Sequence, residues 1–363
     1  MRLGCSFKSD VWGFYVYGIY FVIIKFMKWE ENYSLLKNNT FGIDASCRYF
    51  FEYSSVDELF SFCADRGDLL PGALHIGGGS NLLFVNECYD GLVVHSALKG
   101  IERVGETDDF VFVKAMSGVV WDEFVAYAVS EGLCGVENLS LIPGEVGAVP
   151  VQNIGAYGVE AKDVIDSVEL FDVAGCRVLN VNADECGFAY RNSRFKSDWK
   201  GKFWVVSVTF RLKKKAEFVL DYGNIKSSME GREVTLQSVR DTIIRIREEK
   251  LPSPEVLGSA GSFFMNPVVS ADCLSSLKEH FGDVPSYKLS ETDFKVPAGW
   301  LIEQCGWKGK SYKRAGVYEK QALILVNRGG ATGAEVAELA DIIVKDVKGK
   351  FGIDISPEVC YIK

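Results

Sequence analysis

The chain has 363 residues, of which 48% are hydrophobic and 25% are charged, a balance typical of a folded, soluble protein. This length exceeds one ordinary hydrophobic core, so we expect two or three domains. The formal net charge of −9 argues against nucleic acid as the main partner, although local arginines and lysines can still form a cationic pocket for an anionic substrate.

The N-terminal segment differs from the rest of the chain. Val11–Ile24 is an uncharged apolar run of 14 residues, shorter than the roughly 20 residues of a membrane-spanning helix. No small-residue cleavage site follows it, so it fits a signal peptide poorly. We interpret residues 1–26 as a dispensable extension with Met27 as the true start; a weak membrane anchor is the alternative.

A helix and two short strands are predicted for the first region. Ser55 and Glu58 have the spacing of a capping box, which predicts a helix start there. The apolar residues that follow at helical spacing form one face: Val56, Leu59, Phe60 and Cys63. Strands are expected at Leu74–Ile76 and Leu92–His95.

The second region combines helices with longer strands. We expect a helix over Trp121–Ser130, ended by Gly132. A second helix at about Leu236–Glu249 turns apolar residues inward, namely Val239, Ile243 and Ile246. Strands are expected at Phe110–Ala115, Ser167–Val173, Cys176–Val181 and Phe203–Leu212, with the middle two forming a hairpin.

The third region follows two prolines in Lys250–Pro254, where we place a domain boundary. Thr332 and Glu335 form a second capping box before an apolar helical stripe that Gly352 ends. The other expected elements are a helix at Pro297–Cys305, a strand at Ala322–Asn327 and a terminal strand at Ile353–Tyr361 that carries Glu358. This mixture of hairpins and separate helices favours the α+β class.

Neither the cysteines nor the histidines predict a metal site. The ten cysteines are scattered without a C-x-x-C pair, and His75, His95 and His280 are far apart. Cysteines without a disulfide framework are typical of cytosolic proteins. We therefore expect reduced thiols that are mostly buried.

A candidate catalytic set combines three segments that are distant in sequence. Leu257–Pro267 contains small residues that allow close approach of a ligand, followed by the hydroxyl of Ser262 and the amide of Asn266. Tyr190-Arg191 adds a guanidinium and Pro357-Glu358 a carboxyl group. Together they can donate a proton and stabilise a developing oxyanion, whereas each alone is ordinary.

Two glycine-rich segments predict a cofactor site. His75–Phe84 contains three consecutive glycines, whose N–H groups can form a nest for a pyrophosphate. It lacks the Gly-Lys-Ser/Thr of a phosphate-binding loop and the G-x-G-x-x-G spacing of a dinucleotide fold. Ile142–Gly158 has neither helical nor strand periodicity and is interpreted as a loop shaped around a ligand, where Gln152 and Asn153 suit the edge of a heteroaromatic ring.

With these segments in view, the chain resembles the UDP-N-acetylenolpyruvoylglucosamine reductases, the MurB family of peptidoglycan synthesis, in the longer subclass with a tyrosine-bearing loop. The resemblance runs from about Asn39 to Ile362. It rests on ordered motifs: Asn39–Gly42, Gly77–Asn81, Glu137–Gly144, Pro150–Gly158, Tyr190–Ser193, Leu220–Asn224, Gly261–Phe264 with Asn266-Pro267, and Pro357–Val359.

The resemblance implies a fold and an activity. The fold would be an FAD-binding domain of the PCMH/vanillyl-alcohol-oxidase type in two lobes, residues 39–96 and 97–250, with a C-terminal α+β substrate-binding domain, residues 251–363. The activity would be NADPH-dependent reduction of UDP-N-acetylglucosamine enolpyruvate through non-covalent FAD. A cytoplasmic monomer without stable membrane association or nucleic acid is expected.

The resemblance also implies residue roles. Ser262 would donate the proton, while Arg191 and Glu358 would stabilise the intermediate. Tyr190, Tyr222, Lys250 and Asn266 would line the substrate pocket. The cofactor would contact Gly77, Gly78, Gly79, Ser80, Asn81, Gln152, Asn153, Gly155, Ala156, Tyr157 and Gly158. Met265 departs from the family, where a lysine is frequent, and this changes the expected charge of the pocket.

Two other functions compete with this interpretation. An oxidase of hydroxy acids or alcohols would share the flavin domain, but replacement of the region containing Ser262 and Glu358 would be expected. A non-catalytic UDP-sugar or flavin-binding protein would be expected to lack Ser262, Arg191 or Glu358. All three residues are present.

Overall fold

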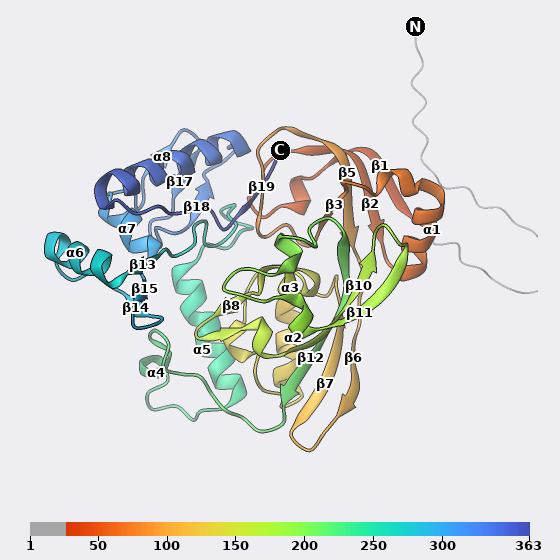
Figure 1. Cartoon of the computed structure of the whole chain (residues 1–363), viewed down its shortest axis with the longest axis horizontal. Helices are drawn as coiled ribbons and strands as arrows, with labels where there is room; N and C mark the ends of the chain where they lie inside the picture. Colours follow the sequence, from red (N-terminus) through yellow and green to blue (C-terminus); the bar gives the residue numbers. More distant parts are fainter. Residues whose placement is uncertain (1–26) are drawn as a thin grey trace, which may run out of the picture.

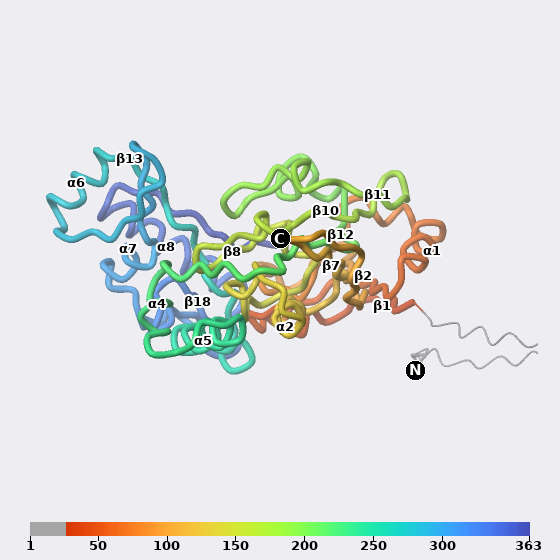
Figure 2. Tube along the Cα trace, turned by 90° about the horizontal axis from the view of Figure 1, so that it is seen from below, coloured from red at the N-terminus to blue at the C-terminus, as the bar shows by residue number. Residues whose placement is uncertain are grey.

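The computed structural model describes residues 27–363. The elements are spread along one long axis, with α1 (Val56–Arg66) near one end and α6 (Ala271–Phe281) at the other (Figure 1). Figure 2, turned by 90°, shows the same order. The Val11–Ile24 run lies outside the described residues. Among the helices of residues 27–363, none is long and apolar enough to cross a membrane.

The first group of elements is a mixed four-stranded sheet. Its order is β1 (Lys28–Ser34), β2 (Ser46–Tyr53), β5 (Cys88–Ser96) and β3 (Leu74–Ile76). β1 is antiparallel to β2, whereas β5 runs parallel to both β2 and β3. The strands expected at Leu74–Ile76 and Leu92–His95 are confirmed.

Helix α1 begins as predicted but presents a slightly different face. The Ser55 hydroxyl accepts a hydrogen bond from the Glu58 N–H, so the cap is confirmed. Leu59 and Phe62 are buried, and Phe62 stacks on Phe51 of β2 at 4.1 Å between ring centroids. The prediction that Phe60 faces the core was wrong, because this stacking turns Phe60 outward to 39% exposure.

The second group is a five-stranded antiparallel sheet. Its order is β11 (Arg177–Asn182), β10 (Ile165–Asp172), β12 (Phe203–Lys213), β7 (Phe110–Met116) and β6 (Ile101–Glu106). The predicted hairpin is β10–β11. The predicted helices are α2 (Trp121–Ser130) and α5 (Leu236–Lys250). The remaining short elements are α3 (Val149–Gln152), α4 (Ile225–Ser228), β8 (Gly155–Ala156) and β9 (Val159–Glu160).

The third group contains two small sheets and three helices. One sheet has the order β13 (Val268–Ser270), β15 (Asp293–Lys295), β14 (Tyr287–Lys288), and the other β16 (Ser311–Tyr312), β17 (Ala315–Val317), β18 (Leu325–Asn327). The helices are α6, α7 (Ala298–Gln304) and α8 (Gly333–Phe351). The capping box of Thr332 and Glu335 starts α8, and Gly352 ends it, as predicted.

The first and third groups share one hydrophobic core. Phe41 and Phe84 from the first group lie in the same buried cluster as Phe263 and Val336 from the third. A parallel pairing of β19 (Cys360–Ile362) with β4 (Leu82–Phe84) joins the two groups further. The division of the chain into domains at residues 96 and 250 stays a prediction. The core shared by the first and third groups contains residues from both sides of these boundaries.

The expected terminal strand is shorter than Ile353–Tyr361. It covers only Cys360–Ile362, and Glu358 precedes it. The reason is that Pro357 forms an isolated antiparallel bridge with Phe264, which draws the chain toward the third group before it turns to β4. Glu358 is thus held between two different backbone partners.

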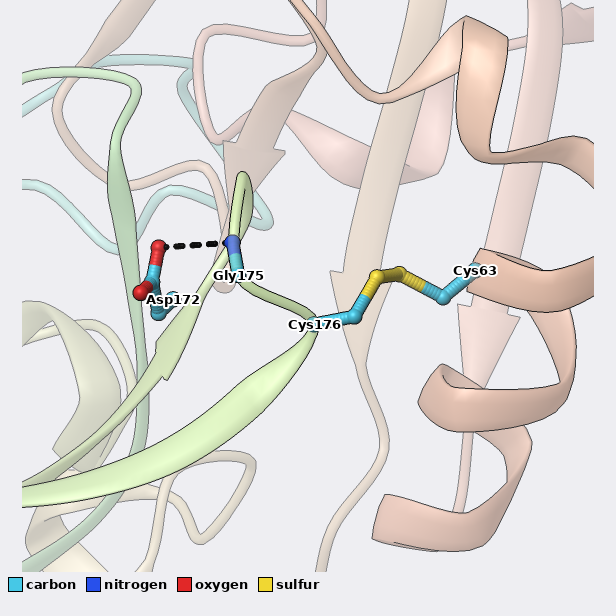
Figure 3. The surroundings of a disulfide bond; sticks show 4 residues. All are labelled: Cys63, Asp172, Gly175 and Cys176. Carbon is cyan, nitrogen blue, oxygen red and sulfur yellow. Dashed lines mark hydrogen bonds between the residues drawn. A yellow bond between two sulfur atoms is a disulfide. The ribbon is translucent and has the colours of Figure 1, made fainter.

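A disulfide joins α1 to the turn of the β10–β11 hairpin (Figure 3). Cys63 and Cys176 have Cα atoms 6.5 Å apart and are separated by 113 residues. The expectation of reduced thiols is therefore wrong for these two, because the hairpin turn brings Cys176 onto α1, a contact that sequence spacing does not reveal. Seven other cysteines of residues 27–363 are free, and Cys88 among them is exposed rather than buried.

Candidate active site

A pocket lies where the three groups of elements meet. Its empty volume, including the open mouth, is about 1060 Å³. The lining includes most of the candidate catalytic and binding side chains: Ser80, Asn81, Gln152, Tyr190, Arg191, Ser262, Asn266 and Glu358. The structure therefore brings the distant sequence segments to one place.

Arg191 and Glu358 form the central ion pair of this pocket. The Arg191 Nε lies 3.1 Å from the Glu358 Oε1, and both side chains are only 19% exposed. The Arg191 guanidinium also donates a hydrogen bond to the Gly155 carbonyl at 2.5 Å. Lys196 donates to the Arg191 carbonyl at 3.1 Å, which fixes a backbone whose φ is +52°. This unusual conformation is held by contacts on both sides of the residue.

Glu358 is positioned by its backbone as well as by Arg191. Its N–H donates to the Phe263 carbonyl at 2.8 Å, and its carbonyl accepts from the Asn81 side chain at 3.2 Å. Burial raises the pKa of the Glu358 carboxyl group, and the nearby charges of Arg191 and Lys196 oppose this shift only in part. Glu358 therefore takes up a proton more readily than an ordinary glutamate.

Ser262 is presented by a tight turn. The preceding Gly261 has a φ of +67°, a conformation that favours glycine. The following Phe263 is buried, and its N–H donates to the Leu323 carbonyl at 2.7 Å. Ser262 itself is exposed, and no residue of 27–363 forms a hydrogen bond with its hydroxyl. The hydroxyl is therefore available to a bound molecule.

Two cations beside Arg191 were missed by sequence reasoning. Lys295 of β15 lies 5.0 Å above the Tyr190 ring, and burial together with the Arg191 charge lowers the pKa of its ammonium. Lys196 donates to the Gln152 Oε1 at 3.1 Å. With Arg191 they form a positive region in an acidic protein, which suits an anionic ligand.

Among the predicted pocket residues, Asn266 and Tyr190 lie in the lining but Lys250 does not. Lys250 is exposed at the end of α5, whereas Arg247, one turn earlier, lines the pocket and donates to the Leu141 carbonyl at 3.2 Å. Arg247 was missed, although a signal existed: it follows Ile243 by four residues and so lies on the buried face of α5.

Tyr222 lies outside the lining, in a group of aromatic rings near the pocket. It stacks on Tyr287 at 5.9 Å between ring centroids and contacts Tyr157 edge-on at 6.4 Å. Gly158 follows Tyr157 and faces the Tyr222 side chain. These residues link the Ile142–Gly158 loop to the third group, and neither Tyr157 nor Gly158 reaches the pocket itself.

The glycine segment Gly77–Asn81 has free backbone donors. Within residues 27–363, the N–H groups of Gly78, Gly79 and Ser80 have no hydrogen-bond acceptor. Gly79 has a φ of +65°, and a Cβ there would overlap the Asn38 carbonyl. Free donors in a turn that excludes side chains fit the pyrophosphate of a dinucleotide cofactor.

The Ile142–Gly158 loop interlocks with this glycine segment. The Ser80 hydroxyl donates to the Pro143 carbonyl at 3.0 Å, and a Cβ on Gly144 would lie 2.8 Å from the Ser80 Oγ. Gln152, Gly155 and Ala156 line the pocket as expected.

Asn153, by contrast, is fully buried. Its side chain donates to the Ala189 carbonyl at 2.8 Å and accepts from the Lys162 N–H at 3.0 Å. Its side chain therefore stabilises the loop and does not line the pocket. No group of metal-binding side chains occurs in the described part of the chain.

The chain is similar to known proteins over most of its length. Residues 252–362 match the family model "UDP-N-acetylenolpyruvoylglucosamine reductase, C-terminal domain", and residues 56–182 match "FAD binding domain". Among solved structures, the UDP-N-acetylenolpyruvylglucosamine reductase of Thermus caldophilus has a TM-score of 0.64 at 22% identity, covering 93% of this chain and 100% of that one, which supports the fold.

Curated relatives extend the likeness over most of the chain. The UDP-N-acetylenolpyruvoylglucosamine reductase of Bacteroides fragilis YCH46 is 52% identical over 334 residues, which are 92% of this chain and 100% of the relative. The protein of the same name from Porphyromonas gingivalis W83 is 45% identical over 337 residues, or 92% and 99%. The chain therefore belongs to the UDP-N-acetylenolpyruvoylglucosamine reductase family.

Proposed function

We propose that this chain reduces UDP-N-acetylglucosamine enolpyruvate to UDP-N-acetylmuramate for peptidoglycan synthesis, with non-covalent FAD as cofactor and NADPH as co-substrate. Membership in a reductase family and the match to an FAD-binding domain identify it as an FAD-dependent oxidoreductase. The meeting of Ser262, Arg191 and Glu358 in one pocket supports this specific reaction.

The reaction requires charge stabilisation followed by protonation. FAD, when bound, would supply the hydride, with NADPH as its source. When hydride adds to the methylene carbon of the enolpyruvyl group, negative charge spreads into the substrate carboxylate. Arg191 is suited to bind that carboxylate, because its guanidinium is permanently charged and offers two parallel donors. The neighbouring cations Lys196 and Lys295 strengthen the field at this point.

Ser262 completes the reduction by giving its proton to the carbon beside the carboxylate. A serine hydroxyl is a weak acid, but a carbanion-like intermediate is a strong base, and the cations nearby ease loss of the proton. The free hydroxyl at the end of the Gly261 turn supports this role.

Glu358 can act in two ways. As a carboxylate it orients Arg191, and the 3.1 Å contact supports this role before substrate binds. As a carboxylic acid it donates a hydrogen bond to the enediolate, and the raised pKa supports this role once substrate occupies the guanidinium.

The decisive test is optical. Purified protein should be yellow, NADPH should bleach it, and UDP-N-acetylglucosamine enolpyruvate should restore the colour without oxygen. Bleaching by a hydroxy acid or an alcohol, with the colour restored by oxygen but not by the UDP-sugar, would indicate an oxidase. Protein that binds FAD without bleaching would indicate a binding protein.

Non-covalent attachment has its own test. Acid precipitation should release the yellow colour into the supernatant, because the pocket holds the cofactor through hydrogen bonds alone in this proposal. Colour retained in the precipitate would contradict it. Gel filtration of the purified protein, before acid is added, tests whether it is a monomer, as expected.

A further inference from the structure

A glutamate side chain lies against the glycine segment that would hold the cofactor's pyrophosphate. Glu145 lines the pocket, and its Oε2 would be 3.1 Å from a Cβ on Gly77. This Oε2 is buried, and no donor of residues 27–363 forms a hydrogen bond with it. A carboxylate at this place opposes binding of a pyrophosphate, because like charges in a buried site repel strongly.

His95 is the group that compensates this carboxylate. Its Nε2 lies 3.5 Å from the Glu145 Oε2, and its Nδ1 lies 2.8 Å from the Glu52 Oε2. The side chains of His95 and Glu145 are 14% and 12% exposed. Because both ring nitrogens face carboxylates, only the doubly protonated imidazolium presents a donor to each.

The other charged groups around His95 are consistent with a doubly protonated His95. Burial lowers the pKa of His95, but the negative charges of Glu145 and Glu52 and the hydrogen bond to Glu52 outweigh burial and raise it overall. Glu52 of β2 has a second cation, Lys28 of β1, at 3.6 Å.

His75 of β3 is neutral, because burial and the His95 charge lower its pKa to about 3. Its Nε2 pairs with the hydroxyl of Tyr53 on β2 at 2.9 Å. Within the described residues, Glu145 therefore has His95 as its one ion-pair partner.

We propose that His95 is a positioning residue for the flavin site, which pairs with Glu145 and neutralises its charge beside the Gly77–Asn81 nest so that the nest can receive the FAD pyrophosphate. The inference rests on the proposed FAD site. If His95 acts in this way, the effect of losing His95 depends on the presence of the Glu145 charge. If His95 were only structural, its loss would have the same effect with or without that charge.

A double-mutant cycle tests this dependence through FAD affinity, measured by the fluorescence of FAD released from the holoenzyme on dilution. His95→Gln should weaken FAD binding by about 10-fold or more, since a neutral amide leaves Glu145 uncompensated. Glu145→Gln should bind at least as tightly as the wild type. The double variant H95Q/E145Q should return to within about 3-fold of wild type. His280→Gln, on the exposed face of α6, is the matched control.

The same measurement across pH gives a second readout. FAD affinity of the wild type should fall as pH rises from 6 to 9, as His95 loses its proton, and E145Q should flatten this profile. A double variant as weak as H95Q, or identical pH profiles for wild type and E145Q, would overturn the inference. Wild-type protein that takes up no FAD at any pH would instead overturn the proposed function, and the inference with it.

Discussion

The Arg191 guanidinium lies 3.1 Å from the Glu358 carboxylate, and the two residues come from different groups of elements. Arg191 is held by the second group through the Gly155 carbonyl, whereas Glu358 is held by the first and third through Asn81 and Phe263. The distance between these two side chains therefore depends on the relative positions of all three groups. Any change that displaces one group relative to another should therefore disturb the pocket.

Substitution of Ser262 should separate the two half-reactions. Ser262→Ala removes the proposed proton donor, so restoration of flavin colour by the UDP-sugar should slow by at least about 100-fold. Bleaching by NADPH needs no proton on a substrate carbon and should stay rapid. Stopped-flow absorbance measures both steps on the same preparation.

Ser262→Cys is the matched control, because a thiol can also donate a proton. It should retain more activity than Ser262→Ala. Equal slowing of both half-reactions in the alanine variant would show that Ser262 shapes the pocket and is not the proton donor.

Glu358 should make stability depend on pH in a defined direction. Its pKa is raised in the folded protein, mainly by burial, so folding favours the protonated form. The stability it contributes is complete below the ordinary glutamate pKa and is lost as pH rises through the raised value.

Glu358→Gln mimics the protonated form, so its melting temperature should gain on that of the wild type as pH rises from 4 to 7. Thermal denaturation at several pH values measures this difference. The activity of this variant should nevertheless fall. Its neutral amide can neither form the ion pair with Arg191 nor exchange a proton, as the Glu358 carboxyl group does. A difference in melting temperature that shrinks with rising pH would contradict the assigned shift.

Truncation should separate the N-terminal extension from the folded protein. A chain that starts at Met27 should fold, bind FAD and react normally, because it retains β1. A chain that starts at Leu35 should lose stability, because removal of β1 leaves the β2 edge unpaired along its antiparallel register with Lys28–Ser34. Solubility, FAD content and melting temperature measure both. Loss of FAD in the Met27 chain would show that residues 1–26 are needed.

The Cys63–Cys176 disulfide should stabilise the oxidised protein. Closing a loop of 113 residues stabilises by roughly 4–5 kcal/mol in the chain-entropy description. Dithiothreitol should therefore lower the melting temperature of the wild type, and C63S should be equally low with no response to the reductant. Cys88→Ser, at an exposed free cysteine, is the control. Alkylation of both cysteines in purified protein before reduction, detected by mass spectrometry, would contradict the pairing.

Local patterns predicted several of the helices and strands, whereas β1, β2, β6 and α6 were not predicted. Helices α1, α5 and α8 begin after Ser55, Thr235 and Thr332, whose side chains cap them, and two of these three caps are visible as capping-box spacings that predict a start. Such signals are carried by residues within one helical turn of each other, so no tertiary information is needed.

Features that depend on tertiary contacts could not be predicted in this way. Phe60 turns outward because Phe62 stacks on a strand, and Cys176 reaches α1 only through the hairpin turn. The helical spacing from Ile243 places Arg247 on the buried face of α5, but only the fold shows that this side chain, and not Lys250, lines the pocket. The candidate catalytic residues themselves came from family motifs, and their convergence required the fold.

The pairing of β19 with β4 sets the order in which the molecule can be completed during synthesis. The Asn81 side chain bonds to a carbonyl 277 residues further along the chain, so the wall of the pocket next to the glycine segment is unfinished while the ribosome is still making α8. Domains generally fold as units during translation, but this pocket is shared between early and late segments. In a nascent chain the backbone of β4 therefore has no strand partner until β19 emerges, and a stalled or C-terminally clipped product would present this unpaired strand to chaperones and proteases.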